Sequence, residues 1–443
     1  MLSIASALHS YFSTRRTTRI SDRQALARLQ QERLHLFRHR VLKKTRFYQN
    51  CWNTPLEDLP IFDKSSYLAE FASLNTAGIE YEEAISASDE VARTQNTSAR
   101  LGNLTVGFST GTTGQRGVFL VTGRERMRWL GAILAKTLPS GLFTRNRIAL
   151  LLAANSGLYQ SATELPNLKF RFFDLHEPLE KHIDGLNAFS PTVLVGTAQS
   201  INLLADLRQH GRLRIAPDYI VSGGEVLEDA VAMHIEQCFG KAPGQVYQCT
   251  EGFFGATCSH GTLHLNEDFQ IIEKEWIDRD SRRFVPIITD LSRDTQALVR
   301  YRMNDILVES DTPCPCGSAL ASISRVEGRC DDAFLVPAKN DERLIPIMPE
   351  VLRQAISGVG EALNDYKLQQ VSPLQLQLFV PTSVCASDVT VVKKRVLDCL
   401  SKLNCRRPEI QTTLGIETSV SRKLRRVERT FAVGMRIGPC ESY

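Results

Sequence analysis

Residues 219–225 read Tyr-Ile-Val-Ser-Gly-Gly-Glu, an apolar run that passes directly into a turn of small and polar residues. Two further apolar runs, at 148–152 and 193–195, precede it and alternate with stretches of helical pattern. Such runs are typical of strands covered on both faces in a parallel α/β sheet. Because the run at 193–195 ends in Gly196-Thr197, polar turns follow two strands at their carboxyl ends, where such sheets bind ligands.

Helices are predicted on both sides of this region. A helix over 226–239 follows the turn and ends at Gly240, with Pro243 beyond it. Nearer the start, Ser21 and Gln24 have the spacing of a capping box, which predicts that another helix begins there. The apolar face of that second helix comprises Leu26, Leu29, Leu34, Phe37 and Val41.

The bulk composition is that of an ordinary globular protein. The 443 residues are 43% hydrophobic and 23% charged, and the net charge of +4 gives no reason to expect a nucleic-acid partner. Eleven cysteines, an odd number, with no secretory signal predict a reducing compartment, and we expect a cytoplasmic protein. No apolar run reaches the roughly 20 residues that a membrane span needs.

The pattern changes along the chain in a way that predicts two domains. Shorter, more polar strand-like pieces occupy 262–311, and a charged segment follows at 325–332. The last 110 or so residues have a mixed strand and helix pattern, as in a small separate domain. We therefore expect an α/β protein with a large domain over 1–329, built from mostly parallel sheets flanked by helices, and a small mobile α+β domain over 330–443.

A glycine-rich loop is the first candidate binding element. Residues 108–117 read Phe-Ser-Thr-Gly-Thr-Thr-Gly-Gln-Arg-Gly, and Arg116 adds a fixed charge. Hydroxyl groups and unhindered backbone N–H groups can donate to phosphate oxygens. The spacing is not that of a Walker loop, since no Lys-Ser/Thr follows at the required distance. A flexible turn remains the alternative.

Three short motifs carry further polar chemistry. Glu251, next to Thr250, follows a strand-like segment and could hold a magnesium ion that bridges phosphates. Asp305 closes the run 300–305 and could accept hydrogen bonds from a ribose diol. Arg329 lies in the charged segment, where it could reach a nucleotide near a hinge. Each of the three could instead be a surface turn or a linker.

The cysteines and histidines between 258 and 316 predict a structural zinc site. Cys314 and Cys316 share a tight Cys-Pro-Cys-Gly turn, and Cys258 with His264 would complete a Cys₃His shell. His264 is preferred over His260 as the fourth ligand. Buried free cysteines without metal are the alternative.

A basic tail over 421–429 contains Lys423. Such a charge run is usually a solvated surface or a weak site for polyanions. A single lysine projected from a mobile domain could instead neutralise charge that develops on a phosphate.

The order of these motifs resembles that of the adenylate-forming superfamily, from roughly residue 45 to 430. The closest similarity is to phenylacetate-CoA ligases and the related coenzyme F synthetases, which adenylate a deazaflavin. Three motifs depart from the family pattern. Gln115-Arg116 stands where Pro-Lys is common, Met303-Asn304 where Thr-Gly is usual, and Ser421-Arg422 before Lys423 where Ser-Gly or Gly-Gly is common. The matching motifs are 109–114, 196–197, 222–225, 247–251, 300–305, 328–332 and Lys423.

The resemblance implies a role for each motif. The loop would embrace the β- and γ-phosphates of ATP, the 223–225 turn and Tyr247 would contribute to the nucleotide site, and Asp305 with Arg329 would hold the ribose. Thr250 would contact the α-phosphate, Glu251 would bind Mg²⁺, and Lys423 would stand over the α-phosphate. Asp331 would be the hinge. The residues assigned to the loop and the adenine slot are Ser109, Thr110, Gly111, Thr112, Thr113, Gly114, Gly223, Gly224 and Glu225.

The resemblance also implies an activity. ATP-dependent adenylation of a small carboxylic acid would give an acyl- or aryl-AMP, which CoA or the phosphopantetheine of an acyl carrier protein could then accept. Two alternatives remain: transfer of AMP to a phenolic hydroxyl, as in coenzyme F synthetases, and a degenerate relative that binds nucleotide without catalysis. The implied cofactors are ATP, Mg²⁺ and a structural Zn²⁺.

Overall fold

The chain divides into two compact units. The computed structural model describes residues 2–94, 99–108, 116–138, 140–152, 167–356, 359, 366–416 and 426–431. The first unit comprises 1–274, 286–303 and 309–324, and the second comprises 275–285, 304–308 and 325–443. The functional boundary expected between residues 329 and 330 stays a prediction.

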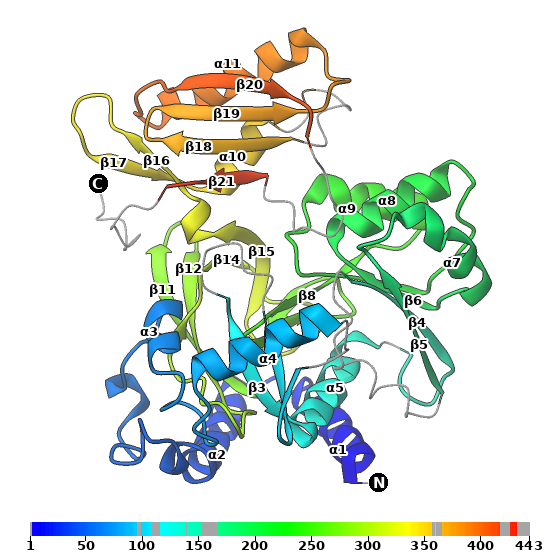
Figure 1. The fold of residues 1–443 in the computed structure, drawn as a ribbon, viewed down its shortest axis with the longest axis vertical. Helices are drawn as coiled ribbons and strands as arrows, with labels where there is room; N and C mark the ends of the chain where they lie inside the picture. The colour runs from blue at the N-terminus through cyan, green and yellow to red at the C-terminus, as the bar shows by residue number, and fades with distance from the viewer. Residues whose placement is uncertain are drawn as a thin grey trace. The chain divides into compact units, whose positions relative to one another are not determined.

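A mostly parallel sheet forms the centre of the first unit (Figure 1). Five parallel strands lie side by side in the order β5-β4-β6-β7-β8, and the antiparallel strands β9 and β10 continue the sheet. The bounds are β4 Asn146–Leu152, β5 Leu168–Asp174, β6 Val193–Gly196, β7 Tyr219–Gly223, β8 Gly244–Cys249, β9 Gly252–Thr257 and β10 Leu263–Leu265.

Burial on both faces explains why the central strands are apolar without a break. Ala149 and Leu151 point to one face of β4 and Ile148 and Leu150 to the other, yet all four are buried. Helices α7 (Ile183–Phe189), α8 (Ala198–Gln209) and α9 (Asp229–Phe239) follow the strands (Figure 1). The three predicted strands are present as β4, β6 and β7, and the predicted α/β class is confirmed.

The predicted helices are present with shifted starts. α9 begins at Asp229 rather than at residue 226, because Glu228 is its N-cap in an extended conformation. It ends as predicted at Gly240, whose φ of +70° lies in the left-handed region. The capping box predicted at Ser21 is wrong: α2 (Arg23–Arg40) is capped by Asp22, whose carboxylate accepts from two backbone N–H groups. No described helix is long and apolar enough to cross a membrane.

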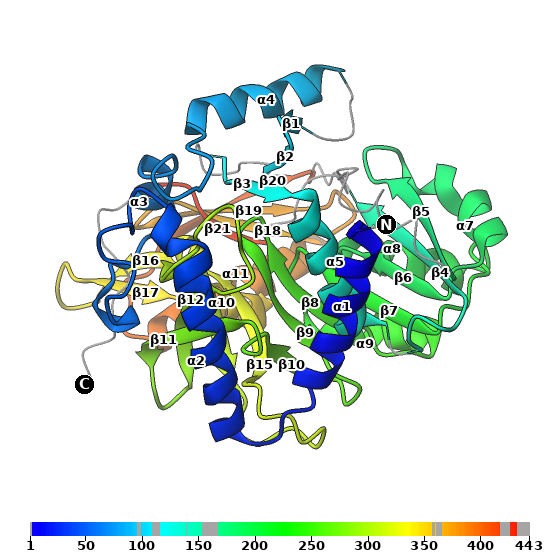
Figure 2. The same ribbon diagram turned by 90° about the horizontal axis from the view of Figure 1, so that it is seen from below.

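Helix α1 (Leu2–Thr17) packs closely along α5 (Gly123–Thr137), as Figure 2 shows. A Cβ at Gly131 would lie 2.2 Å from the carbonyl oxygen of Ala7, so only glycine permits this approach. The Ser10 hydroxyl donates to the carbonyl of Arg128 at 2.7 Å.

A small antiparallel sheet, in the order β1-β2-β3, completes the first unit with α3 and α4. A Cβ at Gly107 would lie 1.9 Å from the ring of Phe119, so any larger residue here would force that ring to move. The bounds are α3 Lys64–Ala69, α4 Tyr81–Thr94, β1 Ala99–Leu101, β2 Leu104–Phe108, β3 Val118–Thr122 and β13 Tyr301–Arg302.

The second unit has an α+β core. Its four-stranded sheet has the order β20-β19-β18-β21, and buried side chains of α10 and α11 belong to the same apolar core. The bounds are β14 Asp305–Glu309, β16 Phe334–Pro337, β17 Leu344–Ile347, α10 Pro349–Ile356, β18 Lys367–Ser372, β19 Gln375–Val380, α11 Ala386–Lys402, β20 Glu409–Leu414 and β21 Val427–Arg429. Four strands run from one unit into the other along the chain: β14, β11 Gln270–Asp278, β12 Arg283–Asp290 and β15 Ser322–Arg329. The mobility expected of this part stays a prediction.

A buried ion pair gives the first testable expectation. Lys136 on α5 bonds Asp268 at 2.9 Å, and their side chains are 6% and 0% exposed. Replacing Lys136 by Met leaves the carboxylate buried without its cation, so we expect the free energy of unfolding to fall by about 3–5 kcal/mol. Urea denaturation measures the loss.

The matched control is Lys181→Met. Lys181 pairs with Glu177 on the surface, where the side chains are 63% and 51% exposed, so its removal costs less than about 1 kcal/mol. Equal losses for the two variants would contradict this assignment.

Candidate functional site

Three polar turns lie at one edge of the parallel sheet. Thr197 follows β6, Gly224 and Glu225 follow β7, and Thr250 and Glu251 follow β8. Because these strands are parallel, their carboxyl ends share one edge. This edge is where a doubly covered sheet leaves room for a ligand.

The glycine turn after β7 is shaped by its backbone. Gly224 has a φ of +80°, which a residue with a side chain rarely adopts. The carboxylate of Glu225 accepts a hydrogen bond from the backbone N–H of Gln199 at 3.1 Å, in the first turn of α8. Glu225 therefore connects the end of β7 to the beginning of α8.

Buried polar atoms near this edge retain hydrogen-bonding capacity. Within the described part of the chain, no hydrogen bond reaches Ser222 Oγ, Gln199 Oε1 or Asn202 Oδ1, although all three atoms are buried. Buried polar atoms in native proteins are usually paired. Their presence on β7 and α8 fits a polar ligand at this edge.

Thr250 and Glu251 form the two-residue turn of a β-hairpin. Cys249 pairs with Gly252 across the β8–β9 ladder, so the two residues between them are held at the end of both strands. Tyr247, two residues before Cys249, is buried, and its ring lies 5.7 Å from that of Phe254.

Two side chains from a later segment hold Glu251. The guanidinium of Arg293 donates to the backbone carbonyl of Glu251. The hydroxyl of Tyr301 lies 3.2 Å from Glu251 Oε1 and donates to it. In the described residues no hydrogen bond or ion pair engages Oε2, so this oxygen is available to a ligand.

Tyr301 is itself fixed by its surroundings. It is 4% exposed, and its ring meets that of Tyr67 edge-on at 5.2 Å between centroids. Burial, reinforced by the charge of Glu251, raises the pKa of Tyr301 far above its usual value. The phenol therefore stays protonated and acts as a donor.

The glycine-rich loop connects two paired strands. Phe108 at the end of β2 lies opposite Val118 at the start of β3, which fixes both ends of the connection. Arg116 is exposed, and its carbonyl accepts from the hydroxyl of Tyr81 at 2.9 Å. The predicted phosphate-binding residues 109–114 and Lys423 lie outside the described residues.

Glu125 anchors the segment that follows this loop. It is 5% exposed and accepts from the backbone N–H groups of Asp294 at 2.6 Å and Thr295 at 2.8 Å. It also forms a capping box with Thr122 at the start of α5. Burial alone would raise the pKa of Glu125, but the hydrogen bonds from Thr295 and from backbone N–H groups lower it.

In the second unit the structure brings Asp305 and Arg329 together. Arg329 Nε lies 4.0 Å from Asp305 Oδ1, and both side chains keep some exposure. Asn304 donates to the carboxylate of Asp331, and its carbonyl accepts from the N–H of Cys330 at 2.8 Å. The unit thus gathers the residues expected at the ribose and at the hinge.

The four predicted zinc ligands lie together in the first unit. The ligand atoms of Cys258, His264, Cys314 and Cys316 all lie within 4.8 Å of one another. The sulfurs of Cys258 and Cys314 are 3.6 Å apart, and Cys316 Sγ is 3.4 Å from His264 Nε2. Zn–S and Zn–N bonds of about 2.3 and 2.0 Å in a tetrahedron give similar separations.

Hydrogen bonding selects the ligand nitrogen of His264. Its Nδ1–H donates to the carbonyl of Leu320 at 2.9 Å, which leaves Nε2 facing Cys316. His260 is exposed and only its backbone N–H contacts Cys258 Sγ, at 3.4 Å. The donor set and the hydrogen bond behind it fit zinc.

The thiols of the cluster differ in acidity. Burial raises the pKa of Cys316 to about 11. Burial opposes ionisation of Cys314 too, but hydrogen bonds from Thr262 and neighbouring groups lower the pKa of Cys314. The surroundings of Cys314 therefore favour its thiolate form.

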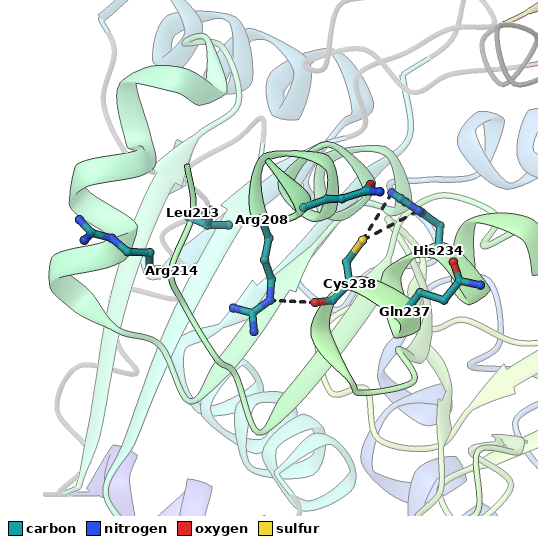
Figure 3. A pocket seen from close by; sticks show the side chains of 7 residues that line it. Arg208, Leu213, Arg214, His234, Gln237 and Cys238 are labelled. Carbon is teal, nitrogen blue, oxygen red and sulfur yellow. Dashed lines mark hydrogen bonds between the residues drawn. The ribbon is translucent and has the colours of Figure 1, made fainter. Parts of the chain in front are cut away.

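A polar pocket of about 460 Å³ lies between α8 and α9, away from the predicted residues (Figure 3). His234 bonds Asp206 at 2.8 Å, and Cys238 Sγ lies 3.8 Å from His234 Nε2. Burial and the charge of Asp206 raise the pKa of Cys238, which makes it a poor nucleophile. We assign no catalysis to this pocket.

Sequence reasoning missed three residues that hold the site. Tyr301 lies inside the 300–305 motif, so the motif itself was the signal that could have pointed to it. Glu125 carries a signal too, since Thr122 and Glu125 have capping-box spacing. Arg293 has no local signal, because its partner Glu251 is far away in sequence.

Comparison with known proteins shows which of them share this fold. No protein-family model matches the chain. The phenylacetate-coenzyme A ligase of Thermus thermophilus is 22% identical over 203 residues, 43% of this chain. The match spans only 44% of that relative.

Solved structures match over more of the chain. 2-Hydroxyisobutyryl-CoA ligase in the postadenylation state aligns with a TM-score of 0.64 at 14% identity, covering 91% of this chain and 88% of that one. The amide bond synthetase McbA from Marinactinospora thermotolerans gives a TM-score of 0.53 at 12% identity, covering 72% and 66%. The chain has the fold of these ligases, and the predicted resemblance to adenylate-forming enzymes is confirmed at the level of the fold.

The Cys/His cluster gives the second expectation. We expect the purified protein to carry about one zinc ion per chain, measured by inductively coupled plasma mass spectrometry after gel filtration. Cys316→Ser removes one of four ligands and should lose the metal and lower the unfolding temperature. Cys238→Ser, outside the cluster, should keep it. A metal-free wild-type protein would refute the zinc site.

Proposed function

We propose that this protein uses ATP to activate a small carboxylic acid as an acyl- or aryl-adenylate. The acyl group then passes to the thiol of CoA or of a carrier protein. The observation that carries the proposal is the Thr250-Glu251 hairpin turn at the carboxyl edge of the parallel sheet, beside the Gly224-Glu225 turn. An oxygen-rich turn at this edge suits a phosphate ligand and its metal ion.

The residues present fit a magnesium ion. Glu251 Oε2 and the hydroxyl of Thr250 are hard oxygen donors of the kind Mg²⁺ takes together with substrate phosphates. Mg²⁺ supplies neutralisation of phosphate charge when it is bound. Tyr301 and Arg293 hold the turn that carries these donors.

The protein side chains would act by positioning and charge. Asp305 and Arg329, 4.0 Å apart, would hold the ribose hydroxyls, with the carboxylate as acceptor and the guanidinium as donor. The glycine-rich loop would hold the leaving phosphates, and Lys423 would offset negative charge at the α-phosphate. All of these are roles in orientation and electrostatic stabilisation.

The proposed reaction consists of two displacement steps. A carboxylate oxygen attacks the α-phosphorus, the bond to the bridging oxygen of the β-phosphate breaks, and pyrophosphate leaves. A thiol then attacks the acyl carbon, the bond from that carbon to AMP breaks, and the thiol proton passes to solvent. No oxidant or reductant is needed.

Pyrophosphate exchange tests the proposal directly. With a panel of aliphatic and aryl acids, we expect at least one acid to drive exchange of labelled pyrophosphate into ATP without CoA. Acid, ATP and Mg²⁺ form the adenylate in the forward step, and labelled pyrophosphate re-forms ATP from that adenylate in the reverse step, so the assay needs no acceptor. Exchange driven only by phenols, or by no acid in the panel, would contradict this function.

The pair of Asp305 and Arg329 gives a further testable expectation. Asp305→Asn keeps the size of the side chain but removes its charge, so we expect the KM for ATP to rise by about 10-fold or more. Steady-state kinetics on an active acid measures this. Asp311→Asn, on an exposed turn further along the chain, is the control. An unchanged KM in Asp305→Asn would remove Asp305 from the nucleotide site.

Lys423 is tested separately. Lys423→Ala should lower the exchange rate by about 100-fold or more while ATP still raises the unfolding temperature, because the charge acts mainly in the transition state. Lys402→Ala is the control for loss of a lysine elsewhere in the same unit. Full exchange activity in Lys423→Ala would overturn the lysine's role.

A further inference from the structure

One buried contact at the candidate site decides how the Glu251 side chain is oriented. The Tyr301 hydroxyl donates to Glu251 Oε1 at 3.2 Å, from a side chain that is 4% exposed. Glu251 stands in a two-residue turn, where a glutamate side chain would otherwise sample several rotamers. The contact selects one of them.

We infer that Tyr301 is a positioning residue that holds the Glu251 carboxylate ready for Mg²⁺; this rests on the function proposed above. With Oε1 fixed by the phenol, Oε2 is left for the metal. Hydrogen bonds to a metal-binding carboxylate orient it and raise its affinity, so the partner matters nearly as much as the ligand.

The surroundings of Tyr301 are suited to this task. Its ring packs edge-on against Tyr67, at 5.2 Å between centroids, and Tyr67 donates to the carbonyl of Ala297 at 3.0 Å. The strand that carries Tyr301 pairs with β12 through Ile288. The phenol is therefore supplied by a rigid frame, and only Glu251 lies on a turn.

A second contact fixes the backbone of the same turn. Arg293 donates to the Glu251 carbonyl, and Arg293 Nε lies 3.6 Å from Asp290 Oδ2. The side chain of Arg293 is 11% exposed. Backbone and carboxylate of Glu251 are thus held independently, by different residues.

Tyr67 offers a matched control. Tyr67→Phe and Tyr301→Phe each remove one buried phenol hydroxyl from the same aromatic pair. Only Tyr301→Phe removes a donor from Glu251, because the Tyr67 hydroxyl bonds a backbone carbonyl. A general loss of packing or stability affects both variants alike.

The experiment measures Mg²⁺ affinity without turnover. The unfolding temperature is recorded at fixed ATP while MgCl₂ is titrated, for wild type, Tyr67→Phe, Tyr301→Phe and Glu251→Gln. We expect Tyr301→Phe to need about 10-fold more Mg²⁺ for half of the stabilisation. Tyr67→Phe should match wild type, and Glu251→Gln should lose most of the Mg²⁺ response.

The double variant Tyr301→Phe/Glu251→Gln sharpens the test. If Tyr301 acts through Glu251, the double variant is no weaker toward Mg²⁺ than Glu251→Gln alone. A Tyr301→Phe titration that overlays that of Tyr67→Phe, while Glu251→Gln is impaired, would overturn the inference and spare the proposed function. No stabilisation of wild type by ATP and Mg²⁺ would overturn both.

Discussion

The buried carboxylate of Glu125 is the interaction on which the frame of the candidate site depends. It accepts from Thr122, Asp294 and Thr295, and so ties the segment after the glycine-rich loop to a segment 170 residues further along the chain. Burying a carboxylate is costly unless every oxygen is satisfied, and here several donors converge on it. From Thr295 the chain continues directly into Tyr301. The Glu125 carboxylate thereby connects the glycine-rich loop, which is the candidate phosphate-binding element, with Tyr301, the residue that orients Glu251.

The sheet explains why rigid strands alternate with polar turns at the edge that holds the candidate site. Strands β6 and β7 are buried on both faces, so their positions are set by core packing, whereas the turns that follow β6, β7 and β8 carry the polar side chains. The reversal from β8 to β9 makes one of these turns as short as a hairpin allows. A carboxylate on such a turn is placed by backbone pairing, and a neighbouring side chain only has to set its rotamer.

Local patterns in the sequence predicted most of the fold but only part of the site. The apolar runs at 148–152, 193–195 and 219–221 predict β4, β6 and β7, because strands that are buried on both faces need no polar face. The start of α2 shifted since Ser21 and Asp22 are both good caps, and only the three-dimensional hydrogen bonds distinguish them. The contact from Tyr301 to Glu251 joins residues 50 positions apart, which no local pattern encodes.

The Cys/His cluster has a consequence for handling the protein. With a metal bound, each sulfur is shielded as a ligand; without it, Cys258 and Cys314 would be two bare thiols with sulfurs 3.6 Å apart. An oxidant that takes two electrons and two protons from them would close a disulfide. Chelation in air would then be a one-way event, and recovery would require a reductant before fresh zinc. The short distance between the sulfurs of Cys258 and Cys314 therefore sets the order of addition: reductant first and metal second.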